Sequence, residues 1–473
     1  MKIRHADIVI PKNDPFANCK LKRKQYAEIL TNIVDSYTDG FVMALNNKWG
    51  TGKTTFVKMW KQHLENSNFK TLYFNAWEND FEKDVLVALI SELEDLKEAK
   101  TEEVFKVVLN NAVPFAKKIV PSILKTLADK YVGEDFVKDL INGTIEVGVD
   151  GLAMEIESYS KRKKSVEDFR QSLGEFVKKT CEDRPVVFII DELDRCRPNY
   201  AVEVLEQIKH LFSVEGIVFV LSIDKVQLGN AVRGVYGSDL IDAEEYLRRF
   251  IDLEYSIPTA NIESGLYCEY LYNYFNFDEF FLNPDRLDTG IFSNEQKYFL
   301  EVSVALFKIN NLTLRQQEKL FAYARIVLKS FKYNNHVLPS LLILLLYSKF
   351  YNVDFYKSVK SKKFSLDELL DNLKGILPKG TVNDENNFSF VLLEALLLNT
   401  YNNFLNGYRS VNLIEVNKET KEKTVIVKSR IDRDKDGGNF LHVLNHLNTD
   451  WDLDKISVDY LLKKVNLTDQ IVI

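Results

Sequence analysis

The segment Asn47–Thr55, NKWGTGKTT, constrains the fold of this chain more than any other feature of its sequence. An apolar run, Phe41–Leu45, precedes it, and apolar residues at helical spacing, among them Phe56, Met59 and Leu64, follow it. Strand, glycine-containing loop and helix in this order are typical of a loop that wraps phosphate groups. The sequence therefore predicts an α/β fold with a phosphate site at the end of its first strand.

The residue types in this loop are those that binding of phosphate groups requires. Gly50 and Gly52 let backbone N–H groups approach phosphate oxygens where a side chain would block them. Lys53 is placed to reach the outer phosphates, and Thr54 is placed to put a hydroxyl on Mg²⁺. The residues expected to bind the nucleotide here are Asn47, Lys48, Trp49, Gly50, Thr51, Gly52, Lys53, Thr54 and Thr55.

The first position of the loop departs from the usual pattern G-x-x-x-x-G-K-[ST], because Asn stands at position 47. Asn tolerates a left-handed backbone better than most residues do. We therefore expect the loop to keep its shape with Asn47 in place of glycine.

A second signal lies in Arg184–Cys196, RPVVFIIDELDRC. Val186–Ile190 is a continuous apolar run, as expected of a strand buried on both faces. Asp191 at its end is suited to hold the Mg²⁺ shell, and Glu192 is suited to polarise an attacking water. A solvated strand end explains two carboxylates equally well when they stand alone. Together with the upstream loop, they favour a site that hydrolyses a nucleoside triphosphate.

Three further strands are predicted at Leu72–Phe74, within Gly216–Leu228, and at Ile251–Ile257. The second of them ends in polar residues, and Asp224 has two interpretations. It either senses the γ-phosphate or caps the helix that begins at Lys225.

Four motifs together resemble the KAP family of P-loop NTPases, over roughly the first half of the chain. They are W-G-x-G-K-T at Trp49–Thr54, F-N-A-W at Phe74–Trp77, I-D-E-L-D-R-C at Ile190–Cys196, and Y-L-R-R-F-I with a later proline at Tyr246–Pro258. The family usually has Asp at the position of Glu192. Glu in place of Asp keeps a carboxylate there. The resemblance implies a parallel sheet of order 5-1-4-3-2 and ATP with Mg²⁺ as ligands.

The same resemblance implies roles for residues outside the motifs. An arginine at the place of Arg249 reaches the γ-phosphate of a neighbouring subunit in related ATPases, although Arg248 and Arg249 are equally explained as surface cations at a helix end. Arg23 and Tyr26 lie where related ATPases cover the adenine, or else on a surface amphipathic helix. Arg315 matches an arginine of the helical lid, or a solvated helix start.

Length and pattern predict the domain organisation. A chain of 473 residues suggests two or three domains. We expect a P-loop domain at 1–265, a lid-like helical domain at 266–350, and a mainly helical region at 351–473 with a β-hairpin at 411–431. A helical insert is expected at about 98–164, either soluble or, as the lesser interpretation, lying on a membrane surface.

The sequence favours a cytoplasmic location. The N-terminus lacks a secretory pattern, no stretch is apolar for long enough to span a membrane, and Val337–Tyr347 is typical of a buried helix. The four cysteines lack metal-ligand spacing, as is usual for reduced thiols. A formal charge of -7 gives no global attraction to nucleic acid, although local basic runs such as Lys161–Lys164 exist.

Three functions fit these observations. The first is an ATPase whose turnover drives a conformational or assembly change, with a homo-oligomer or a partner protein bound through the C-terminal region. The second is a nucleotide-gated scaffold with slow hydrolysis, and the third is a nucleic-acid sensor or motor. Bacterial relatives in the family include phage-exclusion proteins, so the resemblance also implies a role in defence against phage.

Overall fold

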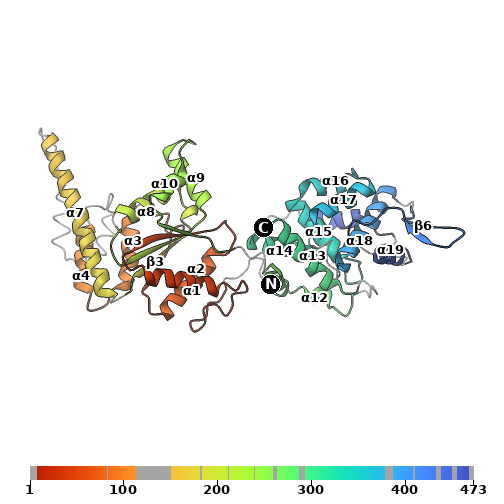
Figure 1. Ribbon diagram of the computed structural model, residues 1–473, viewed down its shortest axis with the longest axis horizontal. Helices are drawn as coiled ribbons and strands as arrows, with labels where there is room; N and C mark the ends of the chain where they lie inside the picture. Colours follow the sequence, from red (N-terminus) through yellow and green to blue (C-terminus); the bar gives the residue numbers. More distant parts are fainter. Residues whose placement is uncertain are drawn as a thin grey trace. The chain divides into compact units, whose positions relative to one another are not determined.

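The computed structural model describes residues 8–82, 84–112, 151–181, 184–210, 212–238, 240–258, 264–286, 293–378, 387–407, 411–432, 438–449 and 455–467. The chain forms two compact units that meet in sequence between Thr259 and Ala260 (Figure 1). The predicted boundaries at residues 265 and 350 stay predictions.

The first unit alternates strands and helices. Its described elements are α1 (Lys24–Ser36), β1 (Phe41–Asn46), α2 (Lys53–Asn66), β2 (Thr71–Asn75), α3 (Val85–Leu93), η1 (Glu94–Leu96), α4 (Glu102–Ala112), α7 (Gly151–Thr180), β3 (Val186–Asp191), η3 (Leu193–Arg195), α8 (Pro198–His210), β4 (Ile217–Ile223), α9 (Lys225–Tyr236), α10 (Ala243–Arg248) and β5 (Leu253–Tyr255).

All five strands of this sheet are parallel and lie in the order β2-β3-β4-β1-β5. This is the predicted order 5-1-4-3-2, which is confirmed. Strands β3 and β4 are fully buried, as their uninterrupted apolar runs require of strands covered on both faces. The fifth strand is shorter than predicted and spans only Leu253–Tyr255.

Helices cover the sheet on both faces (Figure 1). Helices α1 and α2 pack on one face, where Met43, Leu45 and Ile189 of the sheet share a buried cluster with Trp60 of α2. Helices α3, α8, α9 and α10 pack on the other face. Because side chains alternate along a strand, Asp191 at the end of β3 and its neighbour Ser222, one residue before the end of β4, lie on the α2 face.

The predicted insert is helical where the structure describes it. Helices α4 and α7 pack together, with the rings of Phe105 and Phe176 at 5.1 Å between centroids. Asn111 also donates from its side-chain amide to the carbonyl of Asp168 at 3.1 Å. Residues 113–150 of the predicted insert lie outside the described residues.

The second unit is mainly helical, as predicted. Its described elements are α11 (Ser264–Tyr274), α12 (Asp278–Phe281), α13 (Glu295–Ile309), α14 (Leu314–Leu328), α15 (Pro339–Tyr351), α16 (Val353–Lys360), α17 (Leu366–Ile376), α18 (Phe388–Asn406), β6 (Ile414–Val416), β7 (Lys423–Val425), α19 (Gly438–Thr449) and α20 (Val458–Asn466). Strands β6 and β7 form the predicted antiparallel hairpin.

Two apolar helices form the core of the second unit. Helix α15 is buried from Pro339 to Ser348, which confirms the prediction of a buried helix at this apolar run. Helix α18 packs against it and is buried from Ser389 to Asn402. No helix among the described residues is both long and apolar enough to cross a membrane.

Candidate functional site

The loop between β1 and α2 has the backbone of a phosphate-binding loop. Gly50 and Gly52 have φ of 78° and 81°, a left-handed conformation that glycine adopts without a steric cost. Helix α2 begins at Lys53, directly after Gly52. Thr51 closes the loop by donating its hydroxyl to the carbonyl of Lys48 at 2.8 Å. Thr55 follows in the first turn of α2.

The loop keeps its shape with Asn47 at its first position, but not through left-handed backbone there. Among the described residues, non-glycine left-handed backbone occurs elsewhere and not at Asn47. Instead, the side-chain amide of Asn47 donates to the carbonyl of Ile257 at 2.8 Å and accepts from the N–H of Ile257 at 3.0 Å. Asn47 therefore fastens the start of the loop to the segment after β5, which a glycine cannot do.

Lys53 is buried beneath the loop. Its ammonium donates to the carbonyl of Asn47 at 2.5 Å and reaches the carbonyl of Lys48 at 3.4 Å. Burial lowers the pKa of Lys53, although the carboxylates of Asp194 and Asp224 act in the opposite direction. The ammonium of Lys53 is thus enclosed by the loop. Backbone carbonyls stabilise a buried positive charge less than an anion would.

Asp191 ends β3 and is 1% exposed. It accepts a hydrogen bond from the hydroxyl of Tyr73 on β2 at 2.9 Å and another from the backbone N–H of Glu192 at 3.0 Å. Burial, followed by the charge of Asp191, raises the pKa of Tyr73, so its hydroxyl stays a donor. The carboxylate of Asp191 is therefore held in a fixed orientation.

Glu192 has left-handed backbone, with φ of 61°, which is unfavourable for a residue with a Cβ atom. Its carboxylate forms an ion pair with Arg195 at 2.5 Å. Thr54 donates its hydroxyl to Glu192 at 3.4 Å, and Asn75 donates its amide to the other carboxylate oxygen at 3.4 Å. The loop, β2 and β3 thus meet at this carboxylate.

Trp49 links the loop to two buried carboxylates. Its indole N–H donates to Asp194, and its backbone N–H donates to Asp224 at 3.1 Å. Burial raises the pKa of Asp194, and the bond from Trp49 opposes that shift. Asp224 also caps α9 by accepting from the N–H groups of Val226 and Gln227, so the capping interpretation holds. Its contact with the γ-phosphate stays a prediction.

Ser222 completes the row of polar residues at the strand ends. It lies beside Asp191 in the register of β3 and β4, and beside Leu45 in that of β1 and β4. Its hydroxyl is buried and has no hydrogen-bond partner among the described residues. A buried hydroxyl without a partner costs free energy, which a ligand with a polar group at this point would recover.

The remaining predicted site residues belong to other elements. Arg23, next to the first turn of α1, donates to the carbonyl of Gly52 at 3.4 Å, while Tyr26 is half-buried on α1. Arg248 pairs with carboxylates of its own helix, as a surface cation would. The exposed side chain of Arg249 has no hydrogen bond or ion pair with the described residues. Arg315 is exposed at the start of α14, in the second unit.

Sequence reasoning missed several contacts of this site. Tyr73 contacts Asp191 at the end of β3, and Asn75 and Arg195 contact Glu192, the next residue. Asn75 and Tyr73 stand two positions apart, so a strand places both on one face. This spacing, next to a predicted strand end, was the signal in the sequence that could have identified Tyr73 and Asn75 as site residues.

The sequence matches the KAP family P-loop domain over residues 23–265, just over half of the chain. The chain belongs to the KAP family of P-loop NTPases. This KAP-family protein therefore shares its domain with proteins associated with nucleotide binding and hydrolysis.

Two other comparisons add little. No curated protein matches the KAP-family chain significantly. Among solved structures, the Aeropyrum pernix ORC2 protein in ADPNP–ADP complexes aligns over 90% of this chain and 94% of its own, with 13% identity and a TM-score of 0.30. A likeness of that size supports no conclusion about fold or function.

Proposed function

We propose that this protein binds ATP with Mg²⁺ at the carboxyl end of its sheet and hydrolyses it. The observation that carries this proposal is the convergence of Lys53, Thr54, Asp191 and Glu192 around one glycine loop. A cation, a hydroxyl and two carboxylates are the groups that phosphoryl transfer from Mg-ATP requires.

The residues present fit a magnesium–nucleotide ligand. The buried ammonium of Lys53 is satisfied only by backbone carbonyls, and the buried hydroxyl of Ser222 has no partner among the described residues. Thr54 and Asp191 offer the oxygen donors that Mg²⁺ prefers. When bound, Mg²⁺ would supply positive charge to the phosphate oxygens.

In this proposal each residue has one task. Lys53 neutralises charge on the outer phosphates, while Thr54 and Asp191 hold the metal. Glu192 orients the attacking water and accepts its proton, which requires its carboxylate to leave Arg195. The hydroxyl of Ser222 and the carboxylate of Asp224 lie at the end of the adjacent strand, where Asp224 would sense the γ-phosphate.

The experiment is to compare Glu192→Gln with Asp194→Asn in the full chain. Glu192→Gln should bind ATP with Mg²⁺ as tightly as the wild type and lose roughly 10²- to 10⁴-fold in turnover, because the amide keeps the shape and loses the base. Asp194→Asn should retain turnover. If Asp194→Asn stops hydrolysis and Glu192→Gln does not, the catalytic carboxylate has been assigned wrongly.

A second function, a nucleotide-gated scaffold with slow hydrolysis, is favoured by one contact. The ion pair of Glu192 with Arg195 occupies the carboxylate that hydrolysis needs. Steady-state turnover separates the two functions, since ATPases commonly work at about 1 s⁻¹ or faster. Turnover far below that rate, with tight nucleotide binding, supports the scaffold.

We further propose that ATP promotes self-association, in which Arg249 of one copy acts on the nucleotide of another. The motivation is its exposed guanidinium, which makes no hydrogen bond or ion pair with the described residues. Turnover per subunit that rises with protein concentration would support this role. The proposed outcome of turnover is a conformational or assembly change in the cytoplasm, with defence against phage as one setting.

A further inference from the structure

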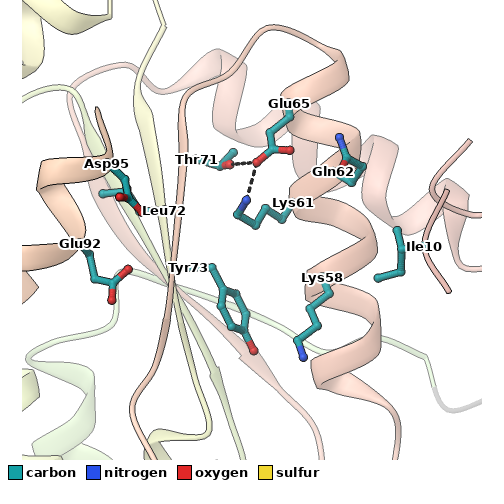
Figure 2. A pocket seen from close by; sticks show the side chains of 10 residues that line it. All are labelled: Ile10, Lys58, Lys61, Gln62, Glu65, Thr71, Leu72, Tyr73, Glu92 and Asp95. Atoms are coloured by element: carbon teal, nitrogen blue, oxygen red, sulfur yellow. Dashed lines mark hydrogen bonds and ion pairs between the residues drawn. The ribbon is translucent and has the colours of Figure 1, made fainter. Parts of the chain in front are cut away.

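The edge strand of the first unit's sheet lies at the bottom of a groove. Strand β2 pairs with β3 on one side and with no strand among the described residues on the other. Helix α2 covers one face of this edge, and α3 with η1 covers the other. The groove between them has a volume of about 400 Å³, and Figure 2 shows the side chains that line it.

The open edge carries backbone groups without partners. Lys70 accepts from the N–H of Val187, and Ala76 donates to the carbonyl of Asp191. Since alternate residues of a strand face the same neighbour, Thr71 and Tyr73 turn their N–H and C=O groups away from β3. No hydrogen bond joins these groups to any described residue. Such an edge is a template for another strand.

The α2 wall of the groove is basic where it meets Tyr73. Lys58 lies on this wall with its ammonium 5.7 Å from the centre of the Tyr73 ring (Figure 2). It forms no ion pair within the described part of the chain. Lys61, one turn farther along, is already paired with Glu65, which also accepts from the hydroxyl of Thr71. Lys58 is thus the cation available to a ligand.

The opposite wall is acidic. Glu92 on α3 and Asp95 on η1 line the groove across β2 from Lys58 (Figure 2). Burial and the neighbouring Asp95 raise the pKa of Glu92 to about 7. The carboxylate of Glu92 has neither a hydrogen bond nor an ion pair with other residues that the structure describes. A cation at this wall would therefore be favourable.

We propose that this groove binds an extended peptide segment of a partner protein, added to the sheet beside β2, with acidic and basic side chains in strict alternation. Successive side chains of a strand point to opposite faces. Acidic residues would therefore face Lys58 on α2, and basic residues would face Glu92 and Asp95. Backbone pairing with Thr71 and Tyr73 supplies affinity, and the two walls supply selectivity.

The groove also has a connection to the strand ends. The hydroxyl of Tyr73, whose backbone forms the open edge, donates to Asp191 at 2.9 Å. A strand paired with Tyr73 would restrain that contact. Any effect of the peptide on nucleotide affinity rests on the proposed function, whereas binding of the peptide itself does not.

The test is a binding titration of the full chain without nucleotide, using a short labelled peptide of alternating glutamate and lysine. One control peptide has the same composition in two blocks, and another is N-methylated along the edge that would pair with β2. The alternating peptide should bind at least tenfold more tightly than either control. Equal binding of all three peptides overturns the proposal.

Variants of the walls sharpen the test. Lys58→Glu and Glu92→Lys should each weaken binding of the alternating peptide about tenfold, since each leaves one wall facing a like charge. The double variant should regain binding, because a shift of one residue exchanges the two faces of the peptide. Lys357→Glu changes an exposed residue of the second unit and alters the net charge as Lys58→Glu does. This control should not change the affinity for the peptide.

Two results contradict the proposal directly. One is unchanged peptide affinity in Lys58→Glu. The other is self-association of the protein that Lys58→Glu abolishes, which would assign the edge to a second copy of the chain. Failure of peptide binding would leave the ATPase proposal intact, because nucleotide is absent from the measurement.

Discussion

Buried charged groups in the two units of this protein have different kinds of partner. In the first unit, the ammonium of Lys53 donates to backbone carbonyls and forms no ion pair with a carboxylate among the described residues. In the second unit, Arg286 forms a buried ion pair with Glu295, and Glu394 accepts hydrogen bonds from Ser429 and from the N–H of Arg430.

The difference separates charged groups that the fold itself satisfies from a cation that lacks a counter-ion. A buried charge paired within its own unit contributes to folding specificity or stability and needs nothing else. A buried donor with weak or absent internal partners retains a cost that an incoming ligand removes. The comparison predicts that changes in the second unit alter stability alone, whereas changes at the strand ends of the first unit alter nucleotide binding.

The largest effect on stability is expected for Arg286→Met. Both side chains of this ion pair are at most 10% exposed, so the change leaves Glu295 buried without its partner. We expect a loss of about 3–5 kcal/mol in the free energy of unfolding. Chemical denaturation would measure it, with the exposed pair variant Arg248→Met, expected at about 0–1 kcal/mol, as control.

Nucleotide affinity should be the same in Arg286→Met and in the wild type. A variant that keeps its stability, or that loses nucleotide binding while folded, would contradict the division between the two units.

An intermediate effect is expected for Asp224→Ala. This change removes the cap of α9 and the acceptor of the Trp49 N–H, and should cost about 1–2 kcal/mol of stability. Because Trp49 belongs to the loop, nucleotide affinity should also fall several-fold. Ser365→Ala removes a comparable cap from α17 in the second unit and should lower stability without changing affinity. Equal losses of nucleotide affinity in Asp224→Ala and Ser365→Ala would contradict the distinction between the two units.

The smallest effect is expected for Asn47→Gly, which restores the usual residue of the motif. It removes both hydrogen bonds to Ile257 and should lower the free energy of unfolding by about 1 kcal/mol. Asn47→Asp keeps the acceptor, and its free energy of unfolding should lie between those of the glycine variant and the wild type. A thermal midpoint that rises in Asn47→Gly would show that these bonds are not stabilising.

Much of the fold was predictable from local pattern and family resemblance. The apolar runs of β1, β3 and β4, the glycine loop and the alternating hairpin are features of short segments, and each was predicted close to its observed bounds. The sheet order came from the four motifs together. The bounds of β5 were predicted less accurately, because strand pairing decides where that strand begins and ends.

The contacts inside the candidate site were not predictable in the same way. Asn47 bonds to Ile257, 210 positions along the chain, and the Trp49 indole bonds to Asp194, 145 positions along. Such pairs depend on how the strands are ordered and on rotamers that no local pattern encodes. Asn47 illustrates this. Its tolerance of left-handed backbone was the local explanation for its place in the loop, whereas the structure shows hydrogen bonds to the distant Ile257.

The measurement that tests the central claim most directly is calorimetric titration of the full chain with a non-hydrolysable ATP analogue and Mg²⁺. The wild type should bind one nucleotide per chain, and Lys53→Ala should lose measurable binding, because the ammonium is the charge that faces the phosphates. Folding of the variant is checked by its unfolding transition. A folded Lys53→Ala variant that binds as tightly as the wild type would contradict the account.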